Sequence, residues 1–203
     1  NEIPREPKAW VSVKNEKRFA RLLKAAEKEI ATEFRTVEPN LKVTATEAPL
    51  PGKVMRKSDQ TKFLNAIRAV QYGVFRMSPE IPGLVEASTN LAKISLGGGH
   101  LKIGSLQRSS VESSKSDVAA AFRAPFDLLG AAVETANEYP GWKPNPSSKI
   151  VQKMAGIYQK MYGDAPVIEA CHAGLECGII GQAYPGLDMV SFGPLIEGAH
   201  SPD

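Results

Sequence analysis

The sequence predicts an α+β fold, in which helices cover a largely antiparallel sheet, followed by a segment of α/β character. Three observations predict it. Several stretches carry apolar residues at helical spacing, three glycines at 97–99 separate two strand-like runs, and residues 139–146 hold three prolines and a glycine in eight positions. Because that Pro-rich break is the strongest in the chain, we place a domain boundary there, between residues 1–141 and 142–203.

The first part opens with a strand and a helix, and the pair then repeats. Residues 9–13 read as a short strand, and the helix expected at 15–34 has an apolar stripe. Residues 41–45 alternate apolar and polar side chains as a half-buried strand does, and a second helix follows at 58–70. The stripe of the first helix consists of Phe19, Leu22, Leu23, Ala26 and Ile30.

The middle of the chain predicts a long hairpin and a third helix. Residues 84–96 and 101–111 are the two strands, and the triple glycine between them is the turn. Residues 116–129 follow with apolar side chains on one helical stripe, and residues 132–138 read as another strand.

The segment after the break predicts one helix and two strands. The helix spans 147–162, with Ser147 or Ser148 as its N-cap, and the strands lie at 166–171 and 189–192. About sixty residues cannot build a large core by themselves, so we expect this segment to join a larger sheet.

Composition excludes several classes of protein. The chain has 203 residues, 25 Lys and Arg against 22 Asp and Glu, and no long basic run, so nucleic acid is not an expected partner. No apolar run approaches the roughly 20 residues that cross a bilayer, so no membrane partner is expected either. The two cysteines are too few for a disulfide framework, and the expected location is the reducing cytoplasm. Both chain ends look cut from a longer protein.

One cluster contains four residue types that bind metals. Cys171, His172, Glu176 and Cys177 lie within seven residues, and His172 and Glu176 would share a face of a helix. The spacing matches neither Cys-x-x-Cys nor His-Glu-x-x-His, and Gly174 and Gly178 favour a tight turn. We therefore favour a structural or substrate-contacting turn and retain a self-contained zinc site as the alternative.

Three further residues are candidates on chemical grounds. His200 lies in a loop-forming Gly-Ala-His-Ser-Pro run, where a scaffold can present a metal ligand or a base. Arg108 lies in the second hairpin strand, and an arginine on a sheet face suits bidentate capture of a carboxylate. His100 follows three glycines, but a hairpin tip explains these better than a phosphate-binding loop.

Three motifs in order resemble the C-terminal signature of bacterial aminoacyl-histidine (Xaa-His) dipeptidases. They are His-Ala-Gly-Leu-Glu-Cys-Gly at 172–178, Tyr-Pro-Gly-Leu-Asp-Met-Val-Ser-Phe-Gly-Pro at 184–194, and Glu-Gly-Ala-His-Ser-Pro-Asp at 197–203. Residues 1–6, Asn-Glu-Ile-Pro-Arg-Glu, are similar to an Asn-Ala-Ile-Pro-Arg-Glu segment of the family, from which Glu2 departs. The resemblance covers the whole chain.

The resemblance implies a two-zinc peptidase whose α/β catalytic domain is interrupted by an α+β lid domain that forms a homodimer. It implies that His200 is a zinc ligand, that Arg108 holds the carboxylate of the Xaa-His substrate, and that Asn1 lies near the substrate. His172 and Glu176 would line the substrate site. The other zinc ligands and the general-base Glu of the family lie upstream, so no catalytic residue is expected within this chain.

These implications leave three functional hypotheses. The first is the lid and C-terminal part of a zinc dipeptidase, which alone should be inactive because a catalytic zinc needs about three protein ligands. The second is a non-catalytic dimerisation or binding module that uses the same sheet. The third is the self-contained zinc module described above.

Overall fold

The computed structural model describes residues 6–172, 176–193 and 196–197. The described residues up to Lys57 form one compact unit, and those from Ser58 onward form a second. The domain boundary that we place after residue 141 is a different division, and it stays a prediction.

The first unit contains one helix and no strand among its described residues. Helix α1 spans Glu16–Glu33, and its N-cap Asn15 accepts a hydrogen bond from the Arg18 amide at 2.8 Å. The predicted helix is therefore confirmed. The strands predicted at 9–13 and 41–45 are wrong: both segments are extended or irregular chain without a partner strand.

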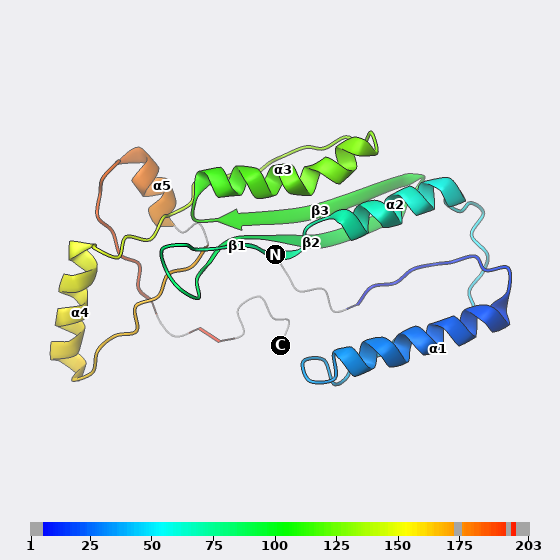
Figure 1. Ribbon diagram of the computed structural model, residues 1–203, viewed down its shortest axis with the longest axis horizontal. Helices are drawn as coiled ribbons and strands as arrows, with labels where there is room; N and C mark the ends of the chain where they lie inside the picture. The colour runs from blue at the N-terminus through cyan, green and yellow to red at the C-terminus, as the bar shows by residue number, and fades with distance from the viewer. Residues whose placement is uncertain (1–5, 173–175, 194–195, 198–203) are drawn as a thin grey trace. The chain divides into compact units, whose positions relative to one another are not determined.

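The second unit is built on a three-stranded antiparallel sheet (Figure 1). Its strands are β1, Gly73–Met77; β2, Val85–Gly97; and β3, His100–Ser109, in the order β1-β2-β3. The β2–β3 hairpin confirms the predicted one. Its turn residues Gly98 and Gly99 have φ of 59° and 81°, the left-handed conformation that a two-residue hairpin turn needs and that glycine adopts without strain. Strand β1 was not predicted.

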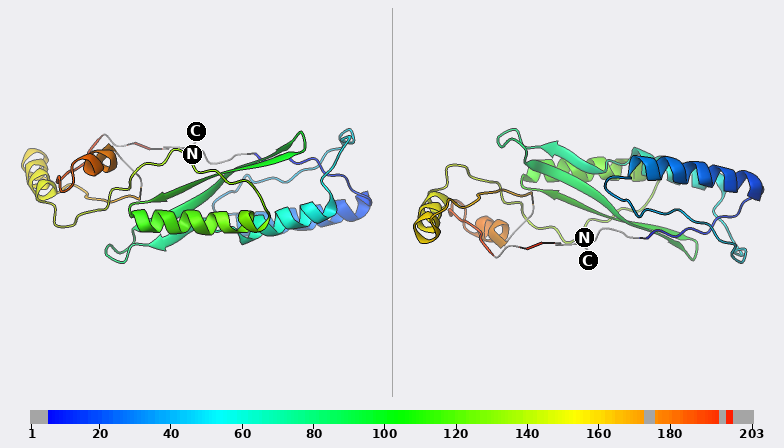
Figure 2. Two further views of the ribbon diagram at one scale, coloured as in Figure 1. Left: turned by 90° about the horizontal axis from the view of Figure 1, so that it is seen from above. Right: turned by 90° about the horizontal axis from the view of Figure 1, so that it is seen from below.

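Two helices pack on this sheet along the same side (Figure 2). Helix α2 spans Lys57–Ala69 and α3 spans Glu112–Leu128, so the helix expected at 58–70 is confirmed and the one at 116–129 begins four residues earlier. The core between these helices and the strands consists of the buried Ala66, Val70, Phe122 and Phe126, with Ile67, Leu91, Ile103 and Val133 packed against them. The predicted α+β fold class is confirmed.

A buried polar network anchors the first turn of α3 to the sheet. Ser114, 1% exposed, donates a hydrogen bond of 2.5 Å to Glu86 on β2 and accepts one of 3.0 Å from Arg76 on β1. Because an unpaired buried polar group would cost about 1–3 kcal/mol, the mutual pairing of these three side chains favours this one position of α3.

The end of the chain contains two more helices. Helix α4, Lys149–Tyr162, begins at its N-cap Ser148, whose hydroxyl accepts from the Val151 amide, and ends before Gly163; the predicted helix and cap are confirmed. Helix α5, Glu176–Ala183, was not predicted. The strands expected at 132–138, 166–171 and 189–192 are wrong, because none of these segments pairs with a strand. Among the described helices, none is long and apolar enough to span a membrane.

Candidate functional site

Two residues singled out from the sequence, Arg108 and His172, come together on the sheet. Arg108 lies on β3 directly opposite Ser88 on β2, and such opposite side chains emerge on the same face of an antiparallel pair. The Ser88 hydroxyl is 2.8 Å from Nε2 of His172, which lies between α4 and α5. Residues from two strands and one connecting segment therefore form a polar cluster.

Arg108 brings an unpaired donor to this cluster. Its Nε is inaccessible to solvent and has no hydrogen-bond partner, and no ion pair between described residues involves its guanidinium. A buried donor without a partner costs about 1–3 kcal/mol, and such an exception in a folded chain marks Arg108 as a functional candidate. A carboxylate fits the planar fork of a guanidinium best.

His172 is held neutral in this environment. Burial of the ring is the main cause of its lowered pKa, and the positive charge of Arg108 lowers the pKa further. At neutral pH the ring therefore carries one N–H and one lone pair, and the positive charge of the cluster belongs to Arg108.

We predict that Arg108→Gln raises the pKa of His172 without restoring its ordinary value, because burial, the larger cause, remains. A ¹H–¹⁵N titration of the ring measures this. Since the folded-state pKa lies below the unfolded one, the contribution of His172 to stability is present above the unfolded pKa of about 6.5 and declines as pH falls below it. An unchanged pKa in Arg108→Gln would show that the two groups do not interact.

A groove of about 320 Å³ adjoins the cluster on the side of β1. Ser88 and His172 line it together with apolar side chains, of which Val74 is the residue directly opposite Ser88 on β1. Ligand sites typically combine an apolar lining with a few placed polar groups and begin at about this volume. The lining residues are Tyr72, Gly73, Val74, Val85, Ser88, Thr89, Asn90 and His172.

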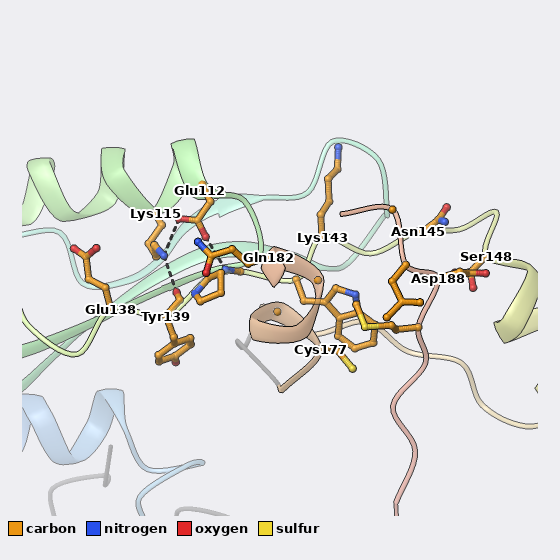
Figure 3. Close-up of a pocket in the computed structure, with 18 residues that line it drawn as sticks. Glu112, Lys115, Glu138, Tyr139, Lys143, Asn145, Ser148, Cys177, Gln182 and Asp188 are labelled. Atoms are coloured by element: carbon orange, nitrogen blue, oxygen red, sulfur yellow. Dashed lines mark hydrogen bonds and ion pairs between the residues drawn. The ribbon is translucent and has the colours of Figure 1, made fainter. Parts of the chain in front are cut away.

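A larger hollow of about 830 Å³ lies where the segment at 139–145 passes between α3 and α5 (Figure 3). From α3, Glu112 accepts a 2.6 Å hydrogen bond from the Gly141 amide, and Lys115 donates one of 2.7 Å to the Tyr139 carbonyl. Lys115 and this amide together lower the pKa of Glu112. On the other side, a Cβ at Gly178 would lie 2.6 Å from the Pro140 carbonyl oxygen, so α5 contacts the segment closely only because it carries glycine there.

The remaining sequence candidates do not join the Arg108 cluster in the described part of the chain. Glu176 is exposed at the first residue of α5, and no described hydrogen bond or ion pair links it to Arg108 or His172. Residues 176–178 are helical, which corrects the tight turn expected at that end of the motif. Asn1 and His200 lie outside the described residues.

The alternative zinc module has no support among the described residues. Cys171, His172, Glu176 and Cys177 are all described, and no group of three His, Cys, Asp or Glu side chains in the described ranges is close enough to hold a metal ion. Sequence reasoning also missed Ser88. Only the register of the folded hairpin, with its irregularity between Leu91 and Lys93, places Ser88 opposite Arg108.

Comparisons with known proteins agree with the resemblance described for the sequence. No family model matches the chain. The chain is 32% identical, over 205 aligned residues, to the cytosol non-specific dipeptidase of Escherichia coli strain K12, with 100% of this chain and 42% of that protein covered. The crystal structure of an aminoacylhistidine dipeptidase from Vibrio alginolyticus superposes with a TM-score of 0.81 at 36% identity, covering 92% of this chain and 38% of that one.

The α+β fold and these similarities identify the chain as a homologue of peptidases. Within that class it is homologous to part of the dipeptidases represented by the Escherichia coli and Vibrio alginolyticus proteins, as the three C-terminal motifs predicted. The chain spans 42% of the length of the first relative and 38% of the second.

Proposed function

We propose that this chain forms the lid and C-terminal part of a di-zinc dipeptidase that hydrolyses Xaa-His dipeptides, and that Arg108 binds the substrate's terminal carboxylate. The observation that carries the proposal is the guanidinium of Arg108, which forms no ion pair with any described residue and lies beside a neutral His172. The similarity to a protein named aminoacylhistidine dipeptidase supports the substrate class.

The chain's own share of the reaction is to bind and orient the substrate. A guanidinium that holds the terminal carboxylate through two hydrogen bonds fixes the distance from the chain terminus to the scissile bond, which selects dipeptides over longer peptides. The Ser88 and His172 side of the groove would contact the residue that carries this carboxylate. Glu176, at the start of α5, and Asn1 are further substrate contacts in this proposal.

Zinc enters the proposal through the resemblance. When bound, two zinc ions would polarise the scissile carbonyl and activate a water. The described residues do not fit a zinc ion by themselves, because they contain no group of three suitable ligands. We propose His200 as the one zinc ligand that the chain contributes, with the other ligands supplied by a longer protein of cytoplasmic location.

The second part of the proposal is that two copies of the chain dimerise through the sheet. The alternative function is a non-catalytic dimerisation or binding module. Ile94 and Leu96, in the outer half of β2, are 46% and 58% exposed, which favours contact with a second copy. The two functions differ in whether the Arg108 cluster binds substrate.

We predict that the purified 203-residue chain hydrolyses no Xaa-His dipeptide, while the complete protein does so with zinc. The physical reason is the number of ligands, since a single histidine cannot fix a catalytic zinc ion. Release of free histidine is measured by chromatography, with zinc content determined on the same samples. Turnover by the chain alone would refute the proposal that the zinc site needs ligands from outside this chain. An inactive zinc-loaded complete protein would refute the proposed dipeptidase activity.

A further inference from the structure

Ser88 occupies the most constrained position of the polar cluster. It lies on the central strand of the sheet, opposite Val74 of β1 on one side and Arg108 of β3 on the other. Strand pairing on both sides fixes its backbone, and a side chain on such an element is placed more accurately than one on a loop.

His172, in contrast, lies on a segment with no regular structure between α4 and α5. Its ring is joined to the sheet by the 2.8 Å contact with Ser88, across 84 residues of sequence. A hydrogen bond of this length restricts the rotation of an imidazole and also selects its tautomer, because the bonded nitrogen either donates or accepts.

We propose that Ser88 is a positioning residue: its hydroxyl donates to Nε2 of His172 and holds the ring in the tautomer protonated at Nδ1. Donation satisfies the Ser88 proton with one bond, whereas a hydroxyl that accepted from Nε2–H would need a second acceptor for that proton. The ring then offers an N–H, and not a lone pair, to an anion held beside Arg108.

The consequence for binding rests on the proposed function. Nδ1–H of His172 and the guanidinium of Arg108 then donate to the same carboxylate from different segments of the chain. Ser88 fixes the position of the first donor relative to the second. An imidazole lone pair facing the same carboxylate would repel it. Replacing Ser88 therefore weakens substrate binding, although the Ser88 side chain carries no charge.

The tautomer is measured directly on the 203-residue chain. Only three histidines, His100, His172 and His200, contribute to the ¹⁵N spectrum of a histidine-labelled sample at about pH 7.5, where a ring with an ordinary or lowered pKa is mostly neutral. We expect protonated Nδ1 at His172, averaged tautomers in Ser88→Ala, and the wild-type pattern in Ser88→Thr, which keeps the hydroxyl. His100 in the exposed hairpin tip is the internal control, and Ser95→Ala, an exposed serine of the same strand, is the matched variant.

The kinetic experiment uses the complete dipeptidase with an Xaa-His substrate. Ser88→Ala should raise KM about 3- to 10-fold, the loss expected for one neutral hydrogen bond, with kcat changed less than about twofold and Ser88→Thr near wild type. A His172 ring protonated at Nε2, or a spectrum unaffected by Ser88→Ala, overturns the proposal. If Arg108→Ala leaves KM unchanged while Ser88→Ala still alters the His172 spectrum, the carboxylate site is refuted and the Ser88–His172 positioning stands.

Discussion

Phe122→Ala should destabilise the second unit by about 3–5 kcal/mol, the range measured when a buried phenylalanine is truncated. Phe122 is 7% exposed on α3, and its ring lies 5.5 Å from that of Phe126 at an interplanar angle of 40°. Both rings pack against Ala66 of α2 and Val70, the residue that follows this helix. Truncation removes apolar area and leaves a cavity that two helices and a sheet cannot collapse to fill.

Urea unfolding measured by circular dichroism tests this loss. Phe192→Ala is the matched control, because Phe192 is 80% exposed and its truncation should change stability by less than about 0.5 kcal/mol. Equal midpoints for the two variants would mean that the cluster of Ala66, Val70, Phe122 and Phe126 is not the core of this unit.

The helices could be predicted because their signals are local. The apolar stripe of α1, and the serine cap and terminal glycine of α4, act within a few residues of the backbone groups that they affect. Helix α5 lacked such a signal. Its two glycines lower helix propensity. Gly178 is needed because the helix passes close to the Pro140 carbonyl, and this contact forms only in the folded chain.

Strands were harder to predict because alternation shows that a segment could have one buried face and does not show which strand it pairs with. Residues 9–13, 41–45 and 132–138 read as strands in the sequence and remain unpaired, whereas the short β1 pairs with β2 through an irregular register. The hairpin was predictable because its turn glycines and its two strands are adjacent in sequence.

The same limit applies to the candidate site. Counting residue by residue from the turn pair of Gly97 and His100 would place Thr89 opposite Arg108. The irregularity between Leu91 and Lys93 shifts the register by one, so that Ser88 is the partner. A bulge of this kind is set by packing and twist of the whole sheet. The sequence thus indicated Arg108 and His172 as separate candidates and could not indicate the serine between them.

Arg108→Ala in the complete protein should raise the KM for an Xaa-His dipeptide roughly 30- to 5,000-fold, corresponding to the roughly 2–5 kcal/mol lost when one partner of a buried charge pair is removed. The terminal carboxylate would lose its bidentate partner, and His172, which is neutral, cannot replace the charge. Arg108→Lys should fall between wild type and alanine, because it keeps the charge and loses the planar fork.

The control for this prediction is Arg123→Ala, which removes the same side chain from an exposed position on α3, where it pairs with Asp127 at 2.7 Å. Its KM should match wild type, and both variants should keep the proposed dimer, as measured by light scattering. If Arg108→Ala loses substrate affinity and keeps the dimer, while Arg123→Ala loses no affinity, the carboxylate site lies on the sheet at Arg108. Unchanged affinity would instead favour the dimerisation module, in which Arg108 binds no substrate carboxylate.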